Sequence, residues 1–259
     1  MADSSATAAW VPVLTFHTLG AGKSPIEWLP QAFRRAMAKL RDNGYRAIGL
    51  MEALSYLRGG ARFPRRSFVL TFDDGYESVY LQAFPALQEH KMPATIFLTV
   101  GSEGRAGGER LPSLNAHPML TWAQILEMAR HGVAFGAHTL THPDLTRLTP
   151  ERVEMELSGS KTVLEDALGA SVDCFAYPYG FYNGRVQAIA REHFALALTD
   201  GIDLLHTGSD AYAAERVDAY YLRDARLFGL MLTGLFPWYV HGRGALMRVR
   251  RAVLSSVGK

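Results

Sequence analysis

The run SFVLTFDDG, residues 67–75, decides how this chain folds and where its chemistry lies. SFVLTF is rich in β-branched and aromatic residues, which predicts a β-strand. Asp73 and Asp74 come at the point where this strand ends, and Gly75 permits a turn that brings both carboxylates towards one pocket. Adjacent carboxylates repel each other unless a cation neutralises one of them. The run therefore predicts either a cation site or a polar turn that only closes the strand.

Strand-like and helical segments alternate on both sides of this run. Alternation of this kind requires crossover connections and a mostly parallel sheet. About six such units in one domain favour a closed or nearly closed barrel, in which chemistry belongs to the loops after the carboxyl ends of the strands. We predict strands at 11–16, 94–100, 133–137, 173–177 and 194–199, and helices at 31–43, 78–90, 122–131, 150–168 and 184–193.

Composition sets broad limits on what the chain does. Its 259 residues are 48% hydrophobic and 20% charged, which is typical of a globular protein. The formal net charge of +2 is too small to indicate a nucleic-acid partner. Cys174 is the only cysteine, so an intrachain disulfide is excluded. The first residues do not resemble a signal peptide, which favours a cytoplasmic protein, and nothing indicates an oligomeric state.

A second polar cluster follows the predicted strand at 133–137. His138 and His142 lie in the run GAHTLTH, and this spacing can place both imidazoles on one metal ion. The alternative is a solvated or hydrogen-bonded histidine pair. Together with Asp74 the pair gives two imidazoles and one carboxylate, each at the end of a strand. Three protein ligands would leave a coordination position open for water, as in catalytic metal sites.

Three short runs of sequence, in their order along the chain, resemble the motifs of one protein family. TFDDG (71–75), HTLTH (138–142) and FAYPYG (175–180) resemble the motifs of polysaccharide deacetylases with a NodB-type domain, carbohydrate esterase family 4. The resemblance extends over about 12–221 and implies an α/β fold, a distorted (β/α) barrel of about seven parallel strands in a single domain. We place this domain at 1–225, followed by an apolar and then basic C-terminal segment at 226–259.

The resemblance also implies an activity, which is removal of N-acetyl groups from an N-acetylated amino-sugar glycan such as a bacterial exopolysaccharide or cell-envelope saccharide. The alternatives are an amidohydrolase that acts on another small or lipid-linked N-acyl substrate and a sugar-binding relative without catalysis. Zn²⁺ is the expected metal, with Co²⁺ or Ni²⁺ as alternatives because such ligands discriminate poorly. By motif position the resemblance implies a general base at Asp73, metal ligands at Asp74, His138 and His142, and an oxyanion-binding backbone N–H at Tyr179. Tyr177 and Pro178 of the third motif are candidate sugar contacts. Tyr182 and Asn183, which follow this motif, are either further sugar contacts or turn residues.

The general acid departs from the common pattern. In many relatives this acid is a late histidine after an apolar strand, but here His17 ends the first predicted strand, VPVLTFH. That order resembles the circularly permuted branch that acts on poly-N-acetylglucosamine. His206, in DLLHTGSD, is the alternative acid, and His17 could also do no more than cap its strand.

The third motif, FAYPYG, also differs from the pattern that many relatives share. Many relatives have an arginine two residues before the proline of this motif, where it orients the base. Here Ala176 occupies that position, two residues before Pro178. Another residue must therefore hold Asp73.

The C-terminal segment combines two properties. Residues 227–240 are strongly apolar and include Pro237. This run of 14 residues is too short to span a bilayer. A basic stretch follows, with Arg243, Arg248, Arg250 and Arg251. This pattern indicates either a last barrel helix with a solvated basic end or peripheral contact of 227–251 with an anionic membrane surface.

Overall fold

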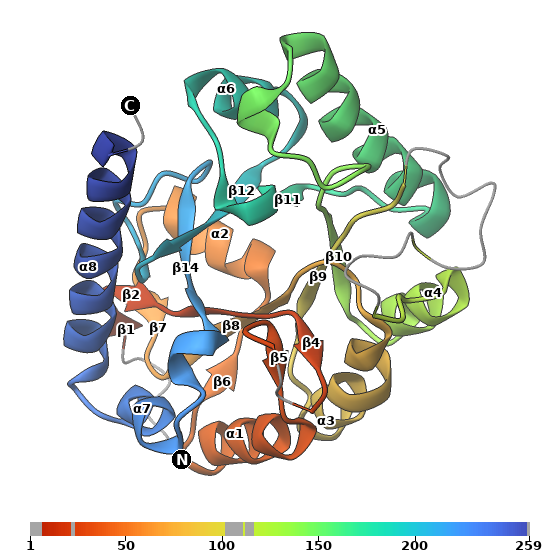
Figure 1. The fold of residues 1–259 in the computed structure, drawn as a ribbon. Helices are drawn as coiled ribbons and strands as arrows, with labels where there is room; N and C mark the ends of the chain where they lie inside the picture. The colour runs from red at the N-terminus through yellow and green to blue at the C-terminus, as the bar shows by residue number, and fades with distance from the viewer. Residues whose placement is uncertain (1–6, 22–23, 102–110, 112–116, 258–259) are drawn as a thin grey trace.

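The computed structural model describes residues 7–21, 24–101, 111 and 117–257, with side chains described as far as residue 249. Within this part of the chain, seven parallel strands close into a barrel in the order β3-β14-β12-β11-β10-β9-β8, and the pairing of β3 with β8 completes the ring (Figure 1). The predicted fold class is confirmed. The barrel strands are β3 (Val13–Phe16), β8 (Ser67–Phe72), β9 (Thr95–Leu98), β10 (Ala134–Ala137), β11 (Cys174–Ala176), β12 (Leu196–Ile202) and β14 (Ala214–Asp218).

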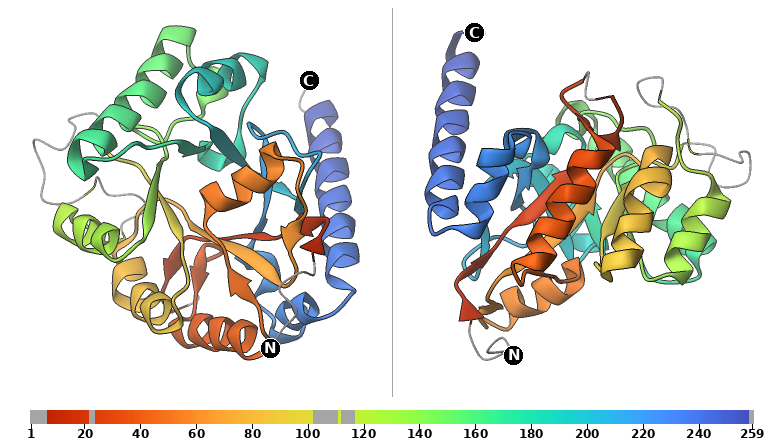
Figure 2. Two further views of the ribbon diagram at one scale, coloured as in Figure 1. Left: turned by 180° about the vertical axis from the view of Figure 1, so that it is seen from behind. Right: turned by 90° about the horizontal axis from the view of Figure 1, so that it is seen from below.

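Most helices surround the barrel on its outside, whereas one of them lies across an end of the barrel (Figures 1 and 2). The helices are α1 (Pro30–Asp42), α2 (Leu50–Arg58), α3 (Phe84–His90), α4 (Trp122–Arg130), α5 (Pro150–Leu168), α6 (Gly184–His193), α7 (Ala225–Gly229) and α8 (Phe236–Val257). The short strands are β1 (Thr7–Ala8), β2 (Trp10–Val11), β4 (Thr18–Leu19), β5 (Glu27–Trp28), β6 (Arg46–Ala47), β7 (Phe63–Pro64) and β13 (Leu205–His206).

Strand β8 shows how the sequence builds the barrel. All six of its residues are buried, and it pairs with β3 on one side and with β6 and β9 on the other. Because side chains alternate along a strand, Phe68, Leu70 and Phe72 pack in the larger cluster, which lies between the barrel and the helices around it, whereas Val69 joins a second cluster with residues of α2 and of β3, β9, β11, β12 and β14. The core is therefore divided between the space under the helices and the interior of the barrel.

Most predicted boundaries agree with the structure to within a few residues. Thr121 and Thr149 cap α4 and α5, and α5 ends at Gly169, which is in the left-handed conformation. The predicted strand at 11–16 is divided at Pro12, which lacks the N–H that a continuous ladder needs. The predicted helix at 78–90 begins as a π-helical turn, Val79–Ala83. Strand β14 was not predicted.

The C-terminal segment is a helix that packs on the barrel. Phe236 and Val240 of α8 are buried, and a Cβ at Gly244 would lie 2.2 Å from the carbonyl oxygen of Ile202, so the glycine permits close approach to β12. In the described part of the chain, no helix has the length and apolarity that crossing a bilayer requires. The proposed domain boundary after residue 225 stays a prediction.

Candidate active site

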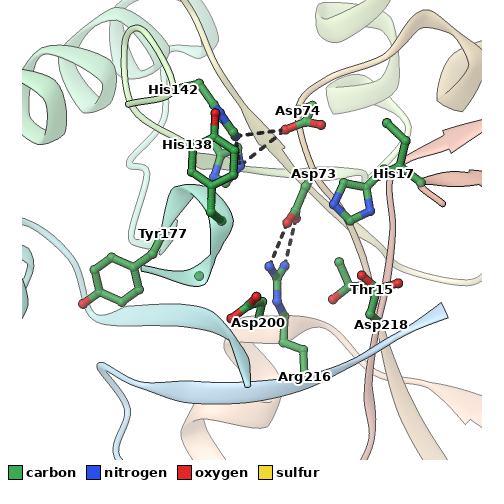
Figure 3. A pocket seen from close by; sticks show the side chains of 13 residues that line it. Thr15, His17, Asp73, Asp74, His138, His142, Tyr177, Asp200, Arg216 and Asp218 are labelled. Atoms are coloured by element: carbon green, nitrogen blue, oxygen red, sulfur yellow. Dashed lines mark hydrogen bonds and ion pairs between the residues drawn. The ribbon is translucent and has the colours of Figure 1, made fainter. Parts of the chain in front are cut away.

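The alternation of strand residues places the polar side chains at one end of the barrel. Val13 of β3 packs in the interior cluster, whereas Thr15 of β3 and His17, directly after this strand, line a pocket of about 200 Å³ (Figure 3). In β8, Val69 occupies the corresponding inner position, and Asp73 lines the same pocket four residues later. Each inner row is thus apolar at its start and polar at its carboxyl end, which puts the pocket where chemistry was predicted.

Asp74, His138 and His142 come together in this pocket. The Nε2 atoms of both histidines lie 3.4 Å from Oδ1 of Asp74 and 3.2 Å from each other. Ligand atoms on a tetrahedral zinc ion, at about 2.0–2.1 Å from the metal, are roughly 3.3 Å apart. The three atoms therefore already form the triangle that one divalent cation would occupy.

The hydrogen bond that His138 makes through Nδ1 also suits a metal ligand. Its Nδ1 lies 2.7 Å from the carbonyl oxygen of Ala176, to which only an N–H can donate. In the neutral ring this leaves the Nε2 lone pair directed into the triangle. Burial favours the neutral ring, but the carboxylates of Asp74 and Asp73 outweigh it and raise the pKa of His138. The site therefore attracts positive charge.

Backbone strain is concentrated around these ligands. Among the described residues, six other than glycine have a positive φ, and four of the six lie at this site. L-residues adopt this conformation rarely and at a cost of about 1–3 kcal/mol, so such residues cluster at functional sites. The four are Asp74 (φ 74°), Thr139 (68°), His142 (58°) and Tyr179 (58°). Gly75 (φ 88°) makes the turn that the sequence predicted.

Asp73 is held by a residue that the sequence analysis missed. Arg216 of β14 donates from both terminal nitrogens to the two carboxylate oxygens of Asp73, at 2.8 and 2.7 Å, and its Nε donates to the Thr199 carbonyl oxygen at 3.0 Å. Burial would raise the pKa of Asp73, but the Arg216 guanidinium outweighs this and lowers it. Arg216 therefore neutralises Asp73 and leaves the charge of Asp74 for a cation.

The histidine loop is anchored from outside the pocket by Glu156 of α5. This carboxylate is buried, and its Oε2 accepts the backbone N–H groups of Leu140 and Thr141, each at 2.9 Å. Its Oε1 accepts the Thr141 hydroxyl at 2.6 Å. These bonds fix the loop between His138 and His142. The separation of the two imidazoles therefore depends on α5, although no residue of this helix lines the pocket.

The two candidate acids lie in different places. His17 lines the pocket with Asp73 and Asp74, and Figure 3 shows its ring facing the same space. His206 is exposed on β13 and is not among the residues that line this pocket; its Nδ1 accepts the Gly208 N–H at 3.0 Å. The structure thus brings together only His17 with the predicted base.

The residues of the FAYPYG region divide into two groups. Tyr177 and Tyr179 line the pocket, and the Tyr179 ring contacts the His142 ring edge-on with centroids 4.6 Å apart. Tyr182 stacks on Tyr177 and lines an adjoining cavity. Pro178 is buried and Asn183 caps α6 by accepting the Val186 N–H; neither lines either cavity. Their predicted sugar contacts stay predictions.

A parallel barrel with a buried carboxylate beside a three-ligand cluster at its carboxyl end has the arrangement of a hydrolase. A sequence model of the family described as polysaccharide deacetylase matches residues 60–195. YxkH of Bacillus subtilis, which is named as a polysaccharide deacetylase, is 29% identical over 82% of this chain and 75% of its own length. The chain belongs to the polysaccharide deacetylase family, carbohydrate esterase family 4, whose members hydrolyse amide bonds of N-acetylated sugars.

Two further similarities concern one branch of this family. A poly-β-1,6-N-acetyl-D-glucosamine N-deacetylase of Staphylococcus aureus is 29% identical over 58% of this chain, which spans only 53% of that relative. The structure of IcaB from Ammonifex degensii superimposes with a TM-score of 0.72 at 26% identity, covering 88% of this chain and 99% of that one.

Proposed function

We propose that this protein is a metal-dependent deacetylase that removes N-acetyl groups from a poly-N-acetylglucosamine glycan. The observation that carries the proposal is the triangle of Asp74, His138 and His142, with sides of 3.2–3.4 Å, directly beside a buried carboxylate that Arg216 holds in place. The ligand set of two imidazoles and one carboxylate suits Zn²⁺, and Co²⁺ or Ni²⁺ are alternatives.

Asp73 is the proposed general base. The chemistry that a divalent cation supplies when bound is polarisation of the amide carbonyl and acidification of the attacking water. Because Arg216 lowers its pKa, Asp73 is ionised at neutral pH, and each of its oxygens retains a lone pair beyond the one that the guanidinium uses. Asp73 can therefore take a proton from water as the water attacks the acetyl carbon.

His17 is the proposed general acid. Attack of water on the amide gives a tetrahedral oxyanion, which the Tyr179 backbone N–H would stabilise by hydrogen bonding. The C–N bond then breaks, and the amine nitrogen takes a proton that His17 donates. Acetate and a glucosamine residue are the products. His17 lines the same pocket as Asp73 and follows a different strand, so the two residues are separate groups for proton uptake and delivery.

An extended glycan is the proposed substrate because the pocket does not end at the ligand cluster. A second cavity of about 1040 Å³ shares Tyr179, Gly180 and Asp200 with it. Phe181 and Tyr182 line this second cavity, and both are exposed. Exposed aromatic faces in a polar cavity suit sugar rings, which present apolar C–H faces and polar edges. Relatives named as poly-β-1,6-N-acetyl-D-glucosamine deacetylases support this choice.

The test is metal content together with acetate release from β-1,6-linked N-acetylglucosamine oligomers. We expect about one metal ion per chain and acetate release that a chelator abolishes and added Zn²⁺ restores. Acetate release from oligomers but not from the monosaccharide would support a polymer substrate. A metal-loaded protein that hydrolyses only small N-acyl amides would contradict the glycan assignment, and a protein that binds no metal would contradict the mechanism.

A further inference from the structure

The pairing of β12 with β14 becomes irregular directly beside the pocket. The register between these strands shifts between Leu198 and Ile202, so residues 199–201 of β12 lie outside the regular ladder. Asp200, in the middle of this segment, lines the pocket. Irregularities of this kind are common next to active sites, where they redirect side chains. Thr199, the first residue of the segment, is buried.

Thr199 makes hydrogen bonds to two different parts of the site. Its hydroxyl donates to the Gly180 carbonyl oxygen at 2.9 Å, and its own carbonyl oxygen accepts the Nε–H of Arg216 at 3.0 Å. Arg216 in turn holds Asp73 through both of its terminal nitrogens (Figure 3). Thr199 does not line the catalytic pocket itself. It therefore connects the turn at Tyr179 with the residue that holds the proposed base.

The turn that the Thr199 hydroxyl holds is strained. Tyr179 (φ 58°) and Gly180 (φ 66°) are both in the left-handed region, which is costly for the tyrosine and persists only where the surroundings hold it. A Cβ at Gly180 would collide with the Asp200 side chain, so the glycine lets the turn lie close against β12. The Gly180 N–H donates to the Tyr177 carbonyl oxygen at 2.8 Å, and this bond does not use the Tyr179 N–H. Tyr179 is thus held between two fixed points.

We propose that Thr199 is a positioning residue for deacetylation, because its hydroxyl fixes the turn that directs the Tyr179 N–H into the pocket. The inference rests on the proposed function, in which this N–H stabilises the tetrahedral oxyanion. A donor of this kind is effective only if its direction is fixed before the negative charge develops. The Thr199 hydroxyl acts through the Gly180 carbonyl and so affects the rate without contact with the reacting atoms.

The test is acetate release from β-1,6-linked N-acetylglucosamine oligomers by variants of Thr199. Thr199→Val removes the hydroxyl but keeps the shape of the side chain and the backbone carbonyl that Arg216 uses. We expect kcat to fall by about tenfold to a hundredfold, while KM and metal content stay at the level of the unaltered protein. Thr199→Ser retains a hydroxyl that can donate to Gly180, so most of the rate should be retained.

Ser160→Ala is the matched control. The Ser160 hydroxyl is also buried and also donates to a backbone carbonyl, that of Leu157 at 2.9 Å, but it lies in α5, which does not line the pocket. This variant should keep the kcat of the unaltered protein. Melting temperatures above the assay temperature would show that all variants are folded during the measurements.

Two further measurements separate positioning from a purely structural role. The affinity for a methylphosphonamidate of glucosamine, which resembles the tetrahedral intermediate, should fall in Thr199→Val by the same factor as kcat/KM, because the donor acts on the transition state. The acidic limb of kcat/KM against pH should stay where it is in the unaltered protein, because the valine carbonyl still holds Arg216.

Four outcomes would overturn the inference alone. They are equal kcat values for Thr199→Val and Ser160→Ala, an equal loss in Thr199→Ser, a shifted acidic limb, and a raised KM at unchanged kcat. The last would mean that Thr199, which also lines the second cavity, acts by contact with the glycan. Failure of the proposed function is a different result, because the unaltered protein itself would then release no acetate, and both proposals would be overturned.

Discussion

The pocket is built from two parts of the barrel that differ in how the sequence reveals them. Residues 60–195, which match the family, supply Asp73 and the three candidate ligands. The flanking residues supply His17, directly after β3, and Arg216 of β14, and these two strands are neighbours in the barrel. The first part contains the proposed metal site and base, and the second contains the groups that would protonate the product and hold the base. The comparison suggests that metal binding and proton transfer can be disrupted separately.

The largest expected effect is the loss of the ligand cluster. Asp74→Asn removes the one charged ligand and leaves two imidazoles, so we expect the metal to be lost and acetate release to fall by about a thousandfold or more. Metal analysis after gel filtration and a coupled acetate assay measure this. Asp166→Asn, on the exposed face of α5, is the matched control and should change neither quantity. Full activity of a metal-free Asp74 variant would contradict the proposed mechanism.

The second effect tests the flanking part alone. His17→Gln keeps a polar side chain but removes the proton donor, so kcat should fall by about 10²–10⁴ while metal content stays at the level of the unaltered protein. His206→Gln, on the exposed strand β13, is the control and should leave kcat unchanged. If His206→Gln lowers kcat and His17→Gln does not, the acid has been assigned to the wrong histidine.

The third effect concerns pH. Arg216→Met removes the cation that lowers the pKa of Asp73, and burial, which remains, raises that pKa. A general base acts only when ionised, so the acidic limb of kcat/KM against pH should move to higher pH. The rate at neutral pH should fall by about tenfold or more, because less base is ionised and its orientation is lost.

Arg216→Lys is the informative comparison for this change, because it keeps the charge but not the two parallel hydrogen bonds. We expect it to leave the acidic limb near its original pH while lowering kcat/KM. Breaking a buried ion pair also destabilises a fold by about 3–5 kcal/mol, so melting temperatures must accompany the rates. An unmoved acidic limb in a folded Arg216→Met variant would show that Arg216 does not control the base.

Arg216 also marks the limit of what the sequence could predict. The motif residues were found because each lies in a short distinctive run after an apolar strand, and a barrel brings such strand ends together. The absence of an arginine at Ala176 correctly indicated that another group holds Asp73. That group could not be named, because AERVD looks like a surface strand with its polar row in water. In the closed barrel this row, with Arg216 and Asp218, lines the pocket instead.

The smallest expected effect on turnover lies at the far side of the metal site, where Glu156 anchors the histidine loop. Glu156→Met keeps the volume but leaves the Leu140 and Thr141 N–H groups without their acceptor. The loop should then hold His138 and His142 less firmly and weaken metal affinity by about 10–100-fold, while kcat at saturating metal stays near that of the unaltered protein. Competition with a chromophoric chelator measures the affinity. Glu156→Gln retains an oxygen that can accept both backbone N–H groups. Its amide NH2 can donate to the Thr141 hydroxyl, which now donates to Glu156. Most of the metal affinity that Glu156→Met loses should therefore be retained in Glu156→Gln. Equal losses in both variants would mean that the charge of Glu156, rather than its hydrogen bonds, supports the site, and a fall in kcat at saturating metal would mean that the loop also positions the substrate.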